Sequence, residues 1–198
     1  MHSVGGFSPI ESMVLAVLYA AGGRIKGRLW LQKALFKLAE FFEELSEDLD
    51  FEAYSYGPFS EAVLEVEEAL ESSGLIQRSD EGLFLTRSGF KAAEHVWRDL
   101  DSKSRDVIRR VVEFMVSLSK DELLLYVYAT RPEYAVESKM RERVLSRRLD
   151  IALRMLRSGK VSLELAAKLA GISVAEMLEI VKRHGVKPYR LHLKDLEL

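Results

Sequence analysis

The sharpest pattern in the sequence lies in residues 162–180, where two short amphipathic segments are joined by a glycine. Two helices that cross closely need a small residue at the crossing, and Ala167 occupies that position. The turn between them needs a residue that tolerates a positive φ angle, and Gly171 follows four residues later. Ser173 and Glu176 then form a capping box at the start of the second segment. This spacing predicts a helix-turn-helix.

The first hundred residues predict several helices and one hairpin. Ser8, Pro9 and Glu11 combine a capping box with a proline at the first helical position, which marks a helix start. Gly22 and Gly23 end that helix. Apolar spacing and turn residues predict the remaining elements. These are helices over residues 29–45, 60–73 and 86–100, a tight turn at 56–58 and a β-hairpin over 75–85.

The order helix, helix, helix, hairpin, helix is typical of a winged helix. Several of these segments also resemble archaeal winged-helix proteins related to the Panacea, or SocA-like antitoxin, domain. The resemblance implies a fold and a regulatory context more than a reaction. The residues that carry it are 27–36 (GRLWLQKALF), 56–60 (YGPFS), 74–76, 85–86, 121–128 and 132–135.

Residues 102–157 are predicted to be helical throughout, with Pro132 breaking the pattern once and a capping box at Ser119 and Glu122. Between residues 138 and 157, arginines surround a sparse apolar stripe, which predicts a basic amphipathic helix. We therefore expect a mainly α fold with a small β wing. Its parts are a winged-helix domain over residues 1–100, a helical connector over 101–157 and a helix-turn-helix module over 158–198.

The C-terminal module has a resemblance of its own, which covers the last 45 residues or so. Residues 158–162 (SGKVS), 166–167 (AA) and 170–173 (AGIS) resemble a family of small archaeal and cyanobacterial proteins. That family is uncharacterised, and some of its members are described as antitoxins. Its recognition helix commonly begins with an Arg-Trp pair after the serine, where this chain has Val174 and Ala175.

Charge is segregated along the chain, although the formal net charge is only −2. Residues 39–81 contain fourteen acidic residues and one basic residue, whereas residues 138–190 contain thirteen basic and five acidic residues. A basic half can neutralise phosphates and an acidic half repels them, so the asymmetry suggests two modules with different partners. The alternative is that the two halves attract each other, within the chain or across a dimer.

The helix-turn-helix predicts a DNA contact at the start of its second helix, which would enter the major groove. Base recognition there is expected to be poor, because Glu176 bonds its own cap and the residues before it are apolar. We mainly expect cations to contact phosphates. Such binding weakens with salt and depends little on the base sequence. The candidate DNA-binding residues are Arg147, Arg148, Arg154, Arg157, Lys160, Lys168, Ser173, Lys182, Arg183, Lys187 and Arg190.

The winged-helix domain is a weaker DNA candidate, since the predicted helix over residues 60–73 carries five glutamates and no lysine or arginine. The hairpin tip adds Asp80 and Glu81, which Arg78 and Arg87 do not offset. We therefore predict a surface for assembly or protein interaction, with a solvated acidic face as the alternative. The candidate protein-interaction residues are Glu61, Glu65, Glu68, Val174 and Ala175.

Several kinds of site are missing from the sequence. It contains no cysteine, its four histidines are isolated, and no glycine-rich segment has the lysine that a phosphate-binding loop requires. The carboxylates are spread around helices rather than paired, so acid–base catalysis has no candidate. We therefore expect no metal, no cofactor and no enzymatic activity.

Location follows from hydropathy and composition. The longest apolar run, residues 13–21, is less than half of the roughly 20 residues that a bilayer helix requires. The N-terminus has no basic stretch followed by an apolar core, so we expect a cytoplasmic protein with no membrane contact. Asparagine is absent and glutamine occurs only at Gln32 and Gln77, which with the abundant charge is typical of a thermophile.

These features predict a dimeric DNA-binding regulatory protein, with the basic half on duplex DNA and the acidic half in assembly or bound to a protein. An antitoxin-like or adaptor protein is the first alternative, in which the helix-turn-helix is a packing module and Val174 and Ala175 contact a partner. Association with RNA or the ribosome through the same arginines is the second. Steep salt dependence with duplex preference, a co-purifying protein, or preference for structured RNA would distinguish the three.

Overall fold

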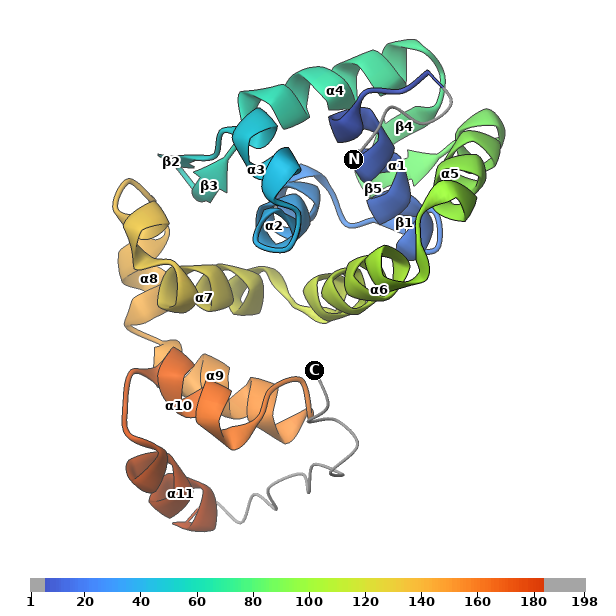
Figure 1. The fold of residues 1–198 in the computed structure, drawn as a ribbon. Coiled ribbons are helices and arrows are strands. Elements are labelled where there is room, and N and C mark those ends of the chain that lie inside the picture. The colour runs from blue at the N-terminus through green and yellow to red at the C-terminus, as the bar shows by residue number, and fades with distance from the viewer. Residues whose placement is uncertain (1–5, 184–198) are drawn as a thin grey trace.

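The computed structural model describes residues 6–183 as a mainly helical chain with two small antiparallel sheets (Figure 1). The helices are α1 (Pro9–Ala20), α2 (Arg28–Ala39), α3 (Glu43–Leu49), α4 (Glu61–Ser72), α5 (Arg87–Asp99), α6 (Ser102–Ser117), α7 (Lys120–Thr130), η1 (Pro132–Ala135), α8 (Arg141–Leu145), α9 (Arg148–Arg157), α10 (Leu163–Ala170) and α11 (Val174–Arg183). The strands are β1 (Arg24–Ile25), β2 (Glu52–Tyr54), β3 (Gly57–Phe59), β4 (Ile76–Ser79) and β5 (Gly82–Leu85).

Helix α1 is the central helix of the N-terminal lobe, which we define as α1 to α6. Its start is the predicted one: the Ser8 hydroxyl accepts a hydrogen bond from the Glu11 N–H, and the Glu11 carboxylate accepts one from the Ser8 N–H. Residues 12–18 are all buried, because α2, α4, α5 and α6 pack around α1. A helix that is apolar on all sides is stable only in such a position.

The predicted hairpin over residues 75–85 is confirmed as β4 and β5, which pair from Ile76–Leu85 to Ser79–Gly82. A third strand, β1, adds to the other edge of β5, so the sheet order is β1-β5-β4. The predicted helices before and after the hairpin are confirmed as α4 and α5, with Ser60 and Thr86 as their N-caps.

The single helix predicted over residues 29–45 is wrong. Helix α2 ends at Ala39, and α3 begins at Glu43 after Phe42, whose backbone is not helical. The break allows α3 to pack against α1 and α4, which buries Leu45 and Leu49. Burial against distant elements therefore outweighs the continuous apolar pattern.

Two further expectations are corrected. Gly57 and Pro58 of the predicted turn lie in β3, which pairs with β2 as a second hairpin. The middle of the chain is interrupted more than once: Leu118 is extended before the Ser119 cap of α7, and the basic helix predicted over residues 138–157 is divided into α8 and α9 near Arg147. Each interruption changes the direction of the chain so that short apolar stripes are buried.

Helix α7 lies between the N-terminal lobe and the last three helices (Figure 1). Its residues 122–128 are all buried, because α2 and β3 pack on it from one lobe and α9 and α10 from the other. Buried residues from Met13 to Val181 accordingly form one continuous apolar core. Within the described residues, no helix is long and apolar enough to cross a membrane.

Candidate nucleic-acid interface

Helices α9, α10 and α11 form a three-helix unit, in which α10 packs against both of the others. Ser162 caps the start of α10, and Ala167 is buried within this helix. Gly171 caps its end, with φ 66° and ψ 38°. The local geometry predicted for the helix-turn-helix is therefore present. Its second helix buries Met177 and Val181 and leaves an outward face exposed. The exposed residues of α11 are Val174, Ala175, Glu176, Glu179, Lys182 and Arg183.

The capping box at the start of α11 engages Ser173 and Glu176 with each other. The Glu176 carboxylate accepts hydrogen bonds from the Ser173 N–H at 2.8 Å and the Ser173 hydroxyl at 2.7 Å. These bonds lower the pKa of Glu176. The Ser173 hydroxyl in turn accepts from the Glu176 N–H. The side chains of Ser173 and Glu176 are thus satisfied within the protein, and Val174 and Ala175 are the residues exposed between them.

Arg148, a predicted phosphate contact, lies over the turn of the helix-turn-helix. One guanidinium nitrogen is 3.5 Å from the Gly171 carbonyl oxygen. A Cβ atom at Gly171 would be 2.5 Å from the Arg148 guanidinium carbon. Glycine is therefore favoured here by its left-handed φ angle, and a larger residue would also displace the end of the Arg148 side chain.

Four of the other predicted cations pair with carboxylates. Arg147 is 3.2 Å from Asp121 of α7, and Lys182 is 3.3 Å from Glu179 one turn earlier. The remaining two pairs are Arg154 with Asp150 and Lys160 with Glu122. The exposed pairs among these contribute little to stability.

The pair between Lys160 and Glu122 is different, because both side chains are largely buried. The Lys160 ammonium donates to Glu122 at 2.7 Å, and Glu122 also caps α7 through Ser119. Desolvation alone would raise the pKa of Glu122, but the hydrogen bonds from Lys160 and Ser119 outweigh it and the pKa is lowered. Lys160 therefore joins the three-helix unit to α7 and is a poor phosphate ligand.

Arg157, Lys168 and Arg183 are the predicted cations that remain available. All three are exposed, and none forms an ion pair with a residue in the range 6–183. One lies in each helix of the three-helix unit. Lys187 and Arg190 lie outside the described residues.

The acidic helix α4 is only partly the surface that the sequence suggested. Glu61, Glu65 and Glu68 are exposed and pair with no cation among the described residues. Glu67, in contrast, is fully buried. It accepts two hydrogen bonds from Arg28, at 3.0 and 3.2 Å, and one from Arg78 at 2.6 Å. The buried glutamate therefore holds α2, α4 and β4 together.

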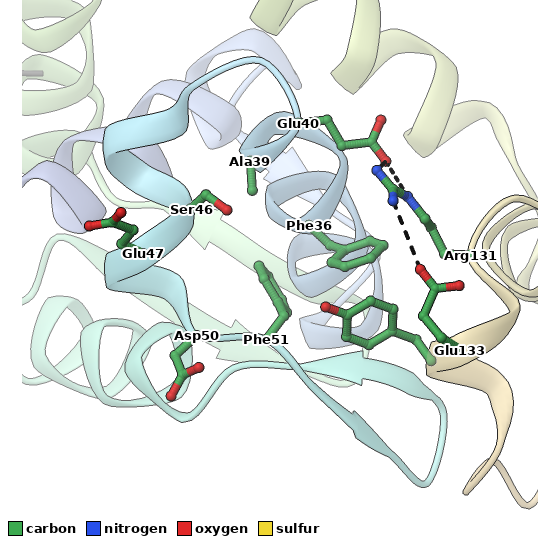
Figure 2. Close-up of a pocket in the computed structure, with 10 residues that line it drawn as sticks. Phe36, Ala39, Glu40, Ser46, Glu47, Asp50, Phe51, Arg131 and Glu133 are labelled. Atoms are coloured by element: carbon green, nitrogen blue, oxygen red, sulfur yellow. Dashed lines mark hydrogen bonds and ion pairs between the residues drawn. The ribbon is translucent and has the colours of Figure 1, made fainter.

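A depression of about 420 Å³ lies where α2 and α3 meet the segment after α7 (Figure 2). Phe36 packs edge-on against Phe51 and Tyr134 in its wall. On one side of these rings Figure 2 shows Arg131 between Glu40 and Glu133, at 2.8 Å and 3.8 Å. The pair between Arg131 and Glu40 joins the end of α2 to the residue before η1, so the depression marks a contact between segments far apart in sequence.

A comparison with family models finds one match. The model of Uncharacterised protein family (UPF0175) matches residues 132–198, less than half of the chain. The match is consistent with the resemblance of residues 158–198 to a small uncharacterised family, and it extends to η1 and α8. No curated protein and no solved structure matches the chain.

Proposed function

We propose that this chain is a DNA-binding regulatory protein whose three-helix unit binds duplex DNA mainly through phosphate contacts. The observation that carries the proposal is the pair α10 and α11, which are joined at Gly171 and packed on α9. Each of the three helices has one exposed cation that forms no ion pair with the described residues, namely Arg157, Lys168 and Arg183. A second helix presented in this way is the form in which helix-turn-helix proteins enter the major groove.

The proposed binding is weakly sequence-specific. Ser173 and Glu176 satisfy each other, so the first turn of α11 has only Val174 and Ala175 to present to base edges. Such side chains can contact a thymine methyl group but cannot make the bidentate hydrogen bonds that distinguish base pairs. Affinity then depends on phosphate neutralisation and falls steeply with salt.

The N-terminal lobe supports a further part of the proposal, that α1, β1, α2, α4, β4 and β5 form a winged helix related to the Panacea domain. Support comes from the order of the helices and from the sheet order β1-β5-β4, in which the β4–β5 hairpin would be the wing. In this arrangement α4 would occupy the position of a recognition helix. Its exposed glutamates repel phosphates, so we assign α4 to homodimer assembly or to a protein partner.

The exposed glutamates of α4 also favour a second candidate function, that of an antitoxin-like or adaptor protein. Glu61, Glu65 and Glu68 form an exposed acidic row, and a basic partner surface would complement it. Val174, 44% exposed, would add an apolar contact from α11. In this function the chain would form a stable complex with a protein and would not need DNA.

The test is binding of the full chain to a random-sequence DNA duplex, measured by fluorescence anisotropy over a salt series. The variant replaces Arg157, Lys168 and Arg183 with glutamate. We expect tight binding at low salt, and in the variant a loss of most affinity with a salt slope smaller by about 3, because each phosphate contact contributes about 0.9.

The matched control replaces Lys91, Lys103 and Arg110 with glutamate. These residues are also exposed and unpaired among the described residues, but they lie on α5 and α6. The control should bind DNA nearly as the wild type does. Equal losses in both variants would indicate a general charge effect, and no binding at low salt would overturn the proposal. A structured RNA hairpin measured in parallel should bind more weakly than the duplex.

A further inference from the structure

Lys33 on α2 is a buried cation without a carboxylate partner. The residue is 2% exposed, and its ammonium donates to the Pro58 carbonyl oxygen at 2.5 Å. It forms no ion pair within the described part of the chain. The neighbouring Gln32 is buried too, but both ends of its amide are hydrogen-bonded. The amide nitrogen donates to the Ser60 carbonyl, and the amide oxygen accepts from the Ser60 N–H.

A small pocket of about 180 Å³ opens beside Lys33, between α2 and the β2–β3 hairpin. Its wall is aromatic: the rings of Tyr54 and Phe59 lie 5.2 Å apart, and Tyr56 lies in the turn of the hairpin. Tyr54 and Tyr56 are 55% and 40% exposed, so the pocket is reached from solvent. Large exposed aromatic side chains around a buried charge are unusual unless the surface contacts something.

Two other cations lie near the pocket, and one of them, the exposed ammonium of Lys120, lies 4.7 Å from the centre of the Tyr56 ring. Arg28 also lines it, but its guanidinium is bound to the buried carboxylate of Glu67. Behind the hairpin, the ring of Tyr128 lies against Gly57, whose φ is 87° and where a Cβ would be 3.1 Å from that ring. Burial raises the pKa of Tyr128, so its phenol is neutral. Lys33 is therefore the buried cation in the wall of the pocket that no carboxylate offsets among the described residues.

We propose that this pocket binds a small aromatic monocarboxylate, with the carboxylate on the Lys33 ammonium and the ring against Tyr54, Tyr56 and Phe59. The buried cation matches one negative charge, whereas a phosphate dianion would need a second cation, and Arg28 in the same wall is already bound to Glu67. The volume is below that of pockets for drug-sized ligands and suits a single ring. The site does not depend on DNA binding and would act as an effector site on the N-terminal lobe.

The binding is linked to a proton. Burial lowers the pKa of Lys33 to about 7, so the free pocket loses its charge above that pH. A bound carboxylate favours the ammonium and raises the pKa again. Affinity is therefore constant below pH 7 and falls by up to about tenfold per pH unit above it, with one proton taken up per ligand bound. The other titratable groups around the pocket are the Arg28–Glu67 pair, the Lys120 ammonium over Tyr56 and the phenols of Tyr54, Tyr56 and Tyr128.

The test is calorimetric titration of the full chain, without DNA, using benzoate as the probe and benzamide as its uncharged isostere. We expect benzoate to bind at least tenfold more tightly than benzamide at pH 6. The variant Lys33→Met should lose this preference, while Lys91→Met, which removes an equal charge from an exposed position on α5, should keep it. Equal binding of the two probes, or no binding of benzoate, would overturn the proposal.

A second measurement tests the proposal even if Lys33→Met fails to fold. Wild-type titrations at pH 8 in two buffers of different ionisation enthalpy report the protons taken up on binding. Uptake that approaches one proton per benzoate is the expected result. Benzoate binding without proton uptake would place the ligand elsewhere and would contradict a site on Lys33, whatever the outcome of the DNA experiment.

Discussion

Glu67 is the residue that joins the acidic helix α4 to the core. Its carboxylate has no exposed surface and is satisfied by Arg28 and Arg78, which come from α2 and β4. The two arginines keep about a third or more of their side chains exposed, so they remain hydrated without the glutamate. The carboxylate has no such alternative, because among residues 6–183 it bonds only to these two cations.

We expect Glu67→Gln to lower the free energy of unfolding by about 3 kcal/mol, since it breaks a buried charge cluster. Glu68→Gln, at the next and exposed position, should change it by less than about 0.5 kcal/mol. Urea unfolding of both variants measures the difference. Equal and small effects would mean that Glu67 belongs with the exposed acidic row after all.

At the scale of elements, the turn between α10 and α11 combines a backbone requirement with a side-chain contact. Gly171 adopts a left-handed conformation, and the Arg148 guanidinium occupies the space beside its Cα. Arg148 starts α9, so the turn is held by the helix that buttresses it. The three helices of the unit are therefore coupled at one point.

We expect Gly171→Ala to cost about 2 kcal/mol of unfolding free energy, of which about 1–2 kcal/mol is the left-handed φ angle. The remainder is the displacement of Arg148, and a double-mutant cycle with Arg148→Ala isolates it. In the Arg148→Ala background the glycine replacement should cost less, but still about 1 kcal/mol. A cycle with no coupling would contradict the contact between the guanidinium and the turn.

At the scale of the whole molecule, α7 carries the connection between the N-terminal lobe and the three-helix unit. Leu124 is completely buried on this helix, which packs against α2 and β3 as well as α9 and α10. The ion pairs of Arg131 with Glu40 and of Lys160 with Glu122 add polar links to both sides. A ligand or partner on one lobe thus has a packed path to the other.

We expect Leu124→Ala to lower stability by about 3 kcal/mol and to weaken both lobes together. Hydrogen exchange measures this directly, because amides of α1 and α10 should lose protection to a similar extent. Leu149→Ala, at a position 37% exposed on α9, is the control and should leave both nearly unchanged. Loss confined to one lobe would favour independent domains with the boundaries predicted at residues 100 and 158.

The sequence by itself was sufficient for the elements that local chemistry specifies. The capping boxes at Ser8, Ser119 and Ser173, the hairpin over 75–85 and the glycine turn at Gly171 involve groups within a few residues of each other, so they can be predicted from spacing. Charge segregation and the absence of cysteine also follow from the sequence alone.

Only the tertiary structure decided which side chains those elements bury and which cations they leave unpaired. Lys33 reaches Pro58 across 25 residues, Arg28 reaches Glu67 across 39, and Lys160 reaches Glu122 across 38. The break between α2 and α3 has the same origin, since it buries Leu45 and Leu49 against distant helices. Burial and ion pairing over such separations depend on how the helices pack, and a pattern with a period of a few residues carries no record of that packing.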